Sequence, residues 1–78
     1  MAMQPTHRVV HHDGWTADIY IADSHIDKLS SENQSVRTRA RHAVCIAFRK
    51  TCLMKHPDFH LAYVEFAHLN INALTASR

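Results

Sequence analysis

The side chains best suited to chemistry are a cysteine and a histidine near the middle of the chain. Cys52 and His56 are four positions apart, and Cys45 lies seven positions before Cys52. Residues at i and i+4 share one face of a helix, so His56 could deprotonate the Cys52 thiol, and Arg49 could lower its pKa. Thiolate and imidazole are also the ligands that Zn²⁺ prefers. The spacing therefore raises two possibilities, a nucleophile and a metal site.

The rest of the chain favours neither possibility. Gly14 is the single glycine among 78 residues, so the chain lacks a phosphate-binding loop and a nucleophile elbow, and it has little volume for a substrate cleft. Two helical turns would separate the Cα atoms of Cys45 and Cys52 by about 10 Å, too far for one disulfide or for easy chelation of one ion. We therefore predict that the protein is not an enzyme and has no catalytic residue.

Histidine is unusually frequent, with eight residues spread over the whole chain. Their spread weakens any single metal-site interpretation. One local group comprises His7, His11 and His12, for which the sequence shows no cysteine or carboxylate at ligand spacing. We predict no physiological metal and no cofactor, and a His/Cys metal-binding protein remains a secondary alternative.

Length and composition predict one folded domain over residues 1–78. Apolar residues form 46% of the chain and charged residues 21%, as in globular proteins. The longest apolar run, residues 43–48, is far shorter than the ~20 residues that cross a bilayer, and the first residues lack a signal-peptide core. Two cysteines do not make the disulfide framework of a small secreted domain. We expect a cytoplasmic protein with no membrane partner.

The elements that must position these side chains begin with a hairpin over residues 6–22. Asp13-Gly14 predicts a type I′ turn. Both central residues of such a turn have a positive φ, and the Asp-Gly pair is among those that adopt it most readily. Strand alternation then directs one set of side chains to the core, namely Trp15, Ala17, Ile19 and Ile21, and the other set outward, namely Thr16, Asp18 and Tyr20. Residues 25–29 form either one helical turn or a loop.

A long helix is predicted over residues 32–55. Ser31 and Gln34 match a capping box, and Pro57 follows the last turn. A helical wheel places seven residues on one stripe that we expect to face the sheet: Val36, Ala40, Ala43, Val44, Ala47, Thr51 and Met54.

A third strand is predicted over residues 59–67, which are aromatic and β-branched, although helical spacing in the same segment leaves a second helix open. Residues 70–78 are expected to be a frayed end. The predicted fold class is α+β, with a small three-stranded antiparallel sheet in β-β-α-β order and one long helix packed on one face.

The outward face of the long helix is the leading candidate for a binding surface. The wheel places there a band of apolar and basic residues: Arg41, Cys45, Phe48, Arg49, Cys52, Leu53 and His56. An apolar centre rimmed by arginines is typical of a protein interface. The band either docks on a partner, a second copy of the chain included, or is covered by the chain's own residues.

Charge is segregated along the sequence, although the net charge is only +2. Acids precede the helix, and six bases with no acid occupy residues 33–57. The expected uncovered sheet face supplies a second candidate, an acidic surface formed by Asp18, Tyr20, Asp23 and Asp27. The helical bases are distributed around the cylinder, so direct nucleic-acid binding through this basic helix is the less favoured alternative.

Small size, scarce glycine and separated acidic and basic patches make the chain similar in general make-up to small phage or mobile-element proteins that block host defence, such as anti-CRISPR proteins. The resemblance covers size and charge style, and no sequence motif carries it. It implies an inhibitor or adaptor that occludes a larger protein assembly, such as a nuclease effector complex.

Overall fold

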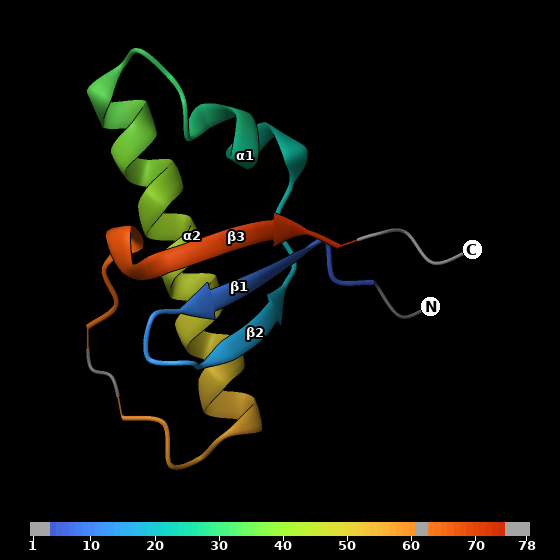
Figure 1. Cartoon of the computed structure of the whole chain (residues 1–78). Coiled ribbons are helices and arrows are strands. Elements are labelled where there is room, and N and C mark those ends of the chain that lie inside the picture. The colour runs from blue at the N-terminus through green and yellow to red at the C-terminus, as the bar shows by residue number, and fades with distance from the viewer. Residues whose placement is uncertain (1–3, 61–62, 75–78) are drawn as a thin grey trace.

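The fold was determined as a computed structural model, which describes residues 4–60 and 63–74. Its elements follow in chain order: β1 His7–His11, β2 Thr16–Ile19, α1 Asp23–Lys28, α2 Gln34–Lys55, the 3₁₀ helix η1 Phe66–His68, and β3 Leu69–Ala73. β1 lies between β2 and β3 and is antiparallel to both, and α2 crosses one face of this sheet (Figure 1). The predicted α+β class, three-stranded antiparallel sheet and packed helix are confirmed.

The hairpin between β1 and β2 closes through a glycine. Gly14 has φ +98° and is the only positive-φ residue in the described part of the chain. Its N–H donates to the His11 carbonyl at 2.7 Å, and the His11 N–H donates to the Trp15 carbonyl at 2.8 Å. Since a type I′ turn needs two positive φ values, that predicted turn type is wrong; the geometry fits a three-residue loop ending on glycine.

Strand alternation decides which side chains of the hairpin are buried. Ala17, Ile19 and Ile21 are buried, and Trp15 packs against the core they help to form, as predicted. The matching inward position of β1 holds Val9, which has no solvent exposure.

α2 begins later than predicted. Its N-cap is Asn33, whose Oδ1 accepts hydrogen bonds from the backbone N–H groups of Ser35 at 2.9 Å and Val36 at 3.3 Å. The expected capping box of Ser31 and Gln34 is therefore replaced by an asparagine cap. The helix ends at Lys55, as predicted.

The buried line of α2 matches the predicted stripe only in part, since Ala40 and Val44 are buried as predicted. Its members recur every fourth residue: Ala40, Val44, Phe48 and Cys52. Phe48 and Cys52 have no solvent exposure, whereas Met54, expected in the core, is 83% exposed. Burying a phenylalanine removes far more apolar surface from water than burying alanines. The helix is therefore rotated so that Phe48, and not the alanine-rich side with Ala43, leads into the core.

The C-terminal third of the chain departs most from expectation. The third strand is Leu69–Ala73, so the predicted strand over 59–67 and the predicted frayed end from residue 70 are both wrong; residues 61–62 and 75–78 lie outside the described residues. The segment after α2 instead covers the helix, because Phe59 and Val64 belong to the core cluster. Phe59 contacts the rings of Trp15 and Phe48, with centroids 5.2 Å and 6.2 Å away.

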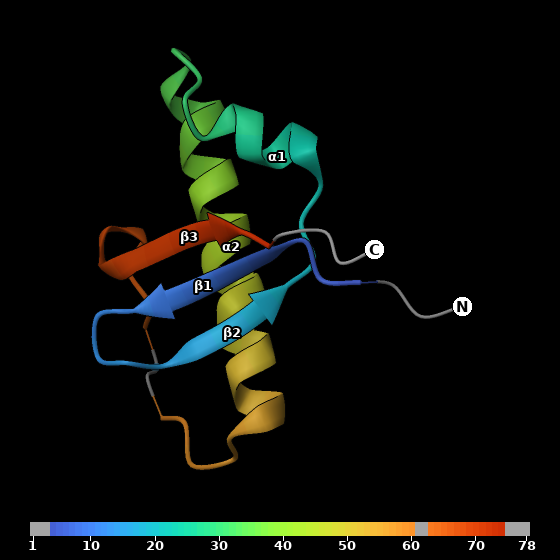
Figure 2. The ribbon, with the colours of Figure 1, turned by 45° about the vertical axis from the view of Figure 1, so that its right-hand side comes forward.

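The short segment after β2, for which a helical turn and a loop were both open, is helical. α1 leads from the sheet to the start of α2 (Figure 2), and Ile26 and Leu29 pack against the core. Across the described ranges, no helix combines the length and the apolar character needed to span a membrane.

Candidate functional site

The surface of α2 opposite its buried line is partly apolar. His42, Ile46, Arg49 and Leu53 follow one another there at helical spacing, and all four are exposed. Ile46 is 46% exposed and Leu53 is 39% exposed. Tyr63, which is 76% exposed, lies beside this line. We call these five residues the outer strip.

A groove of about 190 Å³ runs along the outer strip. It is lined by His42, Cys45, Ile46, Arg49, Tyr63 and Val64. The groove therefore joins the middle of α2 to the segment that precedes η1. Its walls combine aliphatic, aromatic and basic groups, which are residue types that occur together at protein interfaces.

The predicted outer band of α2 is only partly accessible. Phe48 and Cys52 are fully buried and Cys45 is half-buried against the core, so the prediction that Phe48 and Cys52 face outward is wrong. The cause is the segment carrying Phe59 and Val64, which packs into the core and does not form the predicted strand. The chain's own residues shelter this side of the helix.

The other predicted members of the band are exposed in different settings. The Arg41 guanidinium carbon lies 5.5 Å from the ring centroid of Phe66, a cation–π contact that holds the side chain. His56 packs its ring against Trp15, with centroids 5.3 Å apart. Arg49 and Leu53 alone join the outer strip.

Neither thiol has the environment of an activated nucleophile. Burial raises the pKa of Cys52, although Lys55 partly opposes the effect, and burial raises the pKa of Cys45. A raised pKa reduces the thiolate fraction at neutral pH, which is the opposite of activation. Both cysteines are free thiols.

The open face of the sheet is polar and carries both signs of charge. The Arg8 Nε donates to Asp18 Oδ1 at 2.9 Å, and this hydrogen bond holds the pKa of Asp18 below its usual value despite partial desolvation. Asp18 is thus paired, while Tyr20, Asp23 and Asp27 are exposed. The predicted acidic surface keeps free carboxylates only on α1.

Three imidazoles converge where the β1–β2 turn meets η1. One ring nitrogen from each of His11, His12 and His68 can be chosen so that all three lie within 4.8 Å of one another. The Nδ1 atoms of His11 and His12 are 3.1 Å apart, and the rings of His12 and His68 stack with centroids 4.3 Å apart. We call these three residues the histidine cluster.

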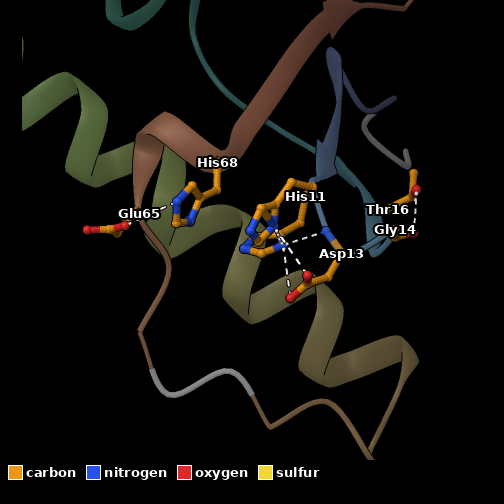
Figure 3. A network of polar contacts seen from close by, with 7 residues as sticks. His11, Asp13, Gly14, Thr16, Glu65 and His68 are labelled. Atoms are coloured by element: carbon orange, nitrogen blue, oxygen red, sulfur yellow. Dashed lines mark hydrogen bonds and ion pairs between the residues drawn. The ribbon is translucent and has the colours of Figure 1, made fainter.

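Two carboxylates border the histidine cluster (Figure 3). The Asp13 oxygens lie 3.7 Å from His11 Nδ1 and 3.4 Å from His12 Nδ1, and Glu65 Oε2 lies 3.3 Å from His68 Nε2. Burial, together with the neighbouring His12, lowers the pKa of His11. The nearby Asp13 carboxylate partly opposes this shift.

The histidine cluster differs from the predicted group of His7, His11 and His12. His7 bonds to Thr6 Oγ1 at 2.9 Å and is not in the cluster; the third member is His68, far along the chain. The expectation of no carboxylate at ligand spacing is also wrong, since Asp13 sits beside both imidazoles. Only the pairing of β1 with β3 brings His68 near, so no local signal could have indicated it.

Comparison with protein families, with curated proteins and with solved structures finds no match to this chain.

Proposed function

We propose that the protein is a non-enzymatic binding module that docks on a larger protein through the outer strip. The observation that carries this proposal is the exposure of Ile46, Leu53 and Tyr63 around Arg49 on one face. Tyrosine and arginine are the residue types enriched at the centres of interfaces, and clustered apolar groups lose unfavourable contact with water when a partner covers them.

Charge indicates what kind of partner fits. α2 contains six basic residues and no acidic one, and Arg49 is one of the residues that line the groove. A complementary partner presents an apolar ridge bordered by carboxylates, because opposite charges steer association and exclude wrong partners. The general make-up of the chain supports a nucleic-acid-handling assembly as the class of partner, with the protein acting as an inhibitor or adaptor.

Matched charge and apolar substitutions test the surface. In capture experiments with the tagged full chain, we expect Arg49→Glu and Ile46→Asp to abolish partner recovery. Lys50→Glu and Met54→Asp make the same chemical changes at exposed positions outside the outer strip, and we expect them to retain it. Circular dichroism should show that all four variants are folded.

Three results would contradict the proposal. Equal recovery by all four variants would remove the outer strip from the interface. A dimer that Arg49→Glu and Ile46→Asp dissociate, measured by sedimentation, would make a second copy of the chain the occupant. Retardation of a random DNA duplex that weakens steeply with salt would favour direct nucleic-acid binding through the basic helix.

A further inference from the structure

The histidine cluster shares no residue with the outer strip, so an inference about it stands apart from the proposed docking function. We propose that His11, His12, Asp13 and His68 form a binding site for one transition metal ion per chain, of the Zn²⁺ class. Imidazole nitrogens with a carboxylate oxygen are the donor set that such ions prefer, whereas Ca²⁺ and Mg²⁺ take oxygen ligands.

The first part of the argument is the separation of three donor atoms. A tetrahedral ion with bonds of about 2.0–2.1 Å holds its ligand atoms roughly 3.3–3.4 Å apart. His11 Nδ1 and His12 Nδ1 are 3.1 Å apart, and Asp13 oxygens lie 3.7 Å and 3.4 Å from them. The 3.7 Å distance joins His11 Nδ1 to Asp13 Oδ2, and the 3.4 Å distance joins His12 Nδ1 to Asp13 Oδ1. The two imidazole nitrogens therefore already have nearly the spacing of two ligands of one ion, and the adjacent Asp13 carboxylate can supply a third donor from either oxygen.

His68 supplies the fourth ligand from a distant part of the chain. One of its ring nitrogens lies within 4.8 Å of a ring nitrogen of His11 and of His12. The His68 ring is stacked on that of His12, with centroids 4.3 Å apart, so this partly exposed side chain has to rotate out of the stack before its lone pair points at the ion. Glu65 lies beside His68 Nε2 (Figure 3). A carboxylate that accepts the second ring N–H of a metal-bound histidine orients the ring and raises its basicity, which leaves His68 Nδ1 for the ion.

The backbone holds these ligands in place. The His12 N–H donates to the His68 carbonyl at 3.0 Å, which joins the turn directly to η1. The His11 side chain is only 4% exposed, so its ring has little freedom. The hydrogen bond from the Asp13 N–H to His11 Nδ1, 3.1 Å long, would be replaced by the bond from His11 Nδ1 to the ion.

An ion at this site would link the β1–β2 turn to the start of β3. Because the unfolded chain does not hold these residues together, binding stabilises the folded state. The proposed role of the metal is therefore structural: it cross-links the β1–β2 turn to the start of β3 and is not a catalytic centre.

The test is a Zn²⁺ titration of the full chain after chelator treatment, followed by calorimetry and thermal denaturation. We expect one ion per chain and a rise in the melting temperature that chelator reverses. His12→Ala and His68→Ala, at exposed or partly exposed positions, should abolish the rise, Asp13→Asn should weaken binding, and Glu65→Gln should weaken it roughly 10-fold. Co²⁺ should show the visible absorption of a tetrahedral site in the wild type, and His12→Ala and His68→Ala should lack it.

His25→Ala is the matched control, because His25 is exposed on α1 outside the cluster, and we expect it to bind like the wild type. The proposal is overturned if the wild type binds no Zn²⁺, if His12→Ala and His68→Ala bind as tightly as His25→Ala, or if several ions bind and every histidine variant loses an equal share. Partner capture by these variants is a separate measurement, so failure here leaves the docking proposal standing.

Discussion

At the scale of single residues, Phe48 determines which side of α2 faces the sheet. It has no solvent exposure. Its ring is stacked against that of His11 and meets the ring of Phe59 edge to face. One turn earlier by helical spacing, Val44 is equally buried, while Ile46, two residues before Phe48, is 46% exposed. Two apolar residues so close in sequence therefore have opposite roles.

This difference predicts opposite effects of truncation. Phe48→Ala should lower the free energy of unfolding by about 3–5 kcal/mol through lost burial and a cavity, and Ile46→Ala should change it by less than about 0.5 kcal/mol. Urea denaturation measures both, and Phe48→Leu, with a smaller loss, serves if Phe48→Ala does not fold. Similar losses for the two alanine variants would mean that the buried line is misplaced.

The two thiols allow a second prediction at this scale. Since burial raises the pKa of both cysteines, each has less thiolate at pH 8 than a cysteine in an unfolded peptide. Cys52 is also fully buried. We expect a thiol reagent to modify Cys52, measured in Cys45→Ser, more slowly than Cys45, measured in Cys52→Ser. In denaturant both should react alike. Fast modification of native Cys52 would show that the covering segment opens readily.

At the scale of elements, the start of α2 depends on a single side chain. Asn33 Oδ1 accepts from two backbone N–H groups, which otherwise have no partner within the helix. Asn33 is itself held by its N–H bond to Ser31 Oγ at 3.1 Å. The cap therefore replaces the serine–glutamine capping box that the sequence pattern predicts.

We expect Asn33→Ala to reduce stability by about 0.5–2 kcal/mol. Gln34→Ala is the control, because Gln34 is exposed and alanine is a good helix former, so its melting temperature should not fall. A larger loss of stability in Gln34→Ala than in Asn33→Ala would contradict the asparagine cap and favour the capping box.

At the scale of the whole molecule, β1 is the central strand that joins the N-terminal hairpin to the C-terminal strand. It pairs with β2 over His7–Val10 and with β3 over His7–His11, and its inward side chains lie under α2. The outer strip and the histidine cluster both depend on this closure, because the segment that connects α2 to β3 carries Tyr63, Glu65 and His68.

Amide hydrogen exchange tests this arrangement. We expect the amides of β1 to exchange more slowly than those of β2 and β3, since opening the central strand requires the loss of both neighbours. Val9, with no exposure, should be among the slowest. Greater protection in β3 than in β1 would contradict the strand order.

Local pattern was sufficient for much of the fold. The Asp13-Gly14 pair marks the hairpin, alternation assigns Ala17, Ile19 and Ile21 to the core, and Pro57 marks the end of α2, because turns, strand alternation and helix termination depend on neighbouring residues. These features alone determine the α+β class.

Only the tertiary structure decided the face of α2, the position of β3 and the two surfaces. A helical wheel gives the angles between side chains but does not say which stripe faces the sheet. The stripe with Phe48 is buried because burying this side chain removes the most apolar area from water. β3 forms at Leu69–Ala73 because β1 offers an edge for it there, a contact between residues some sixty positions apart. The same long-range pairing brings His68 to His11 and Asp13, and short-range spacing contains no information about it.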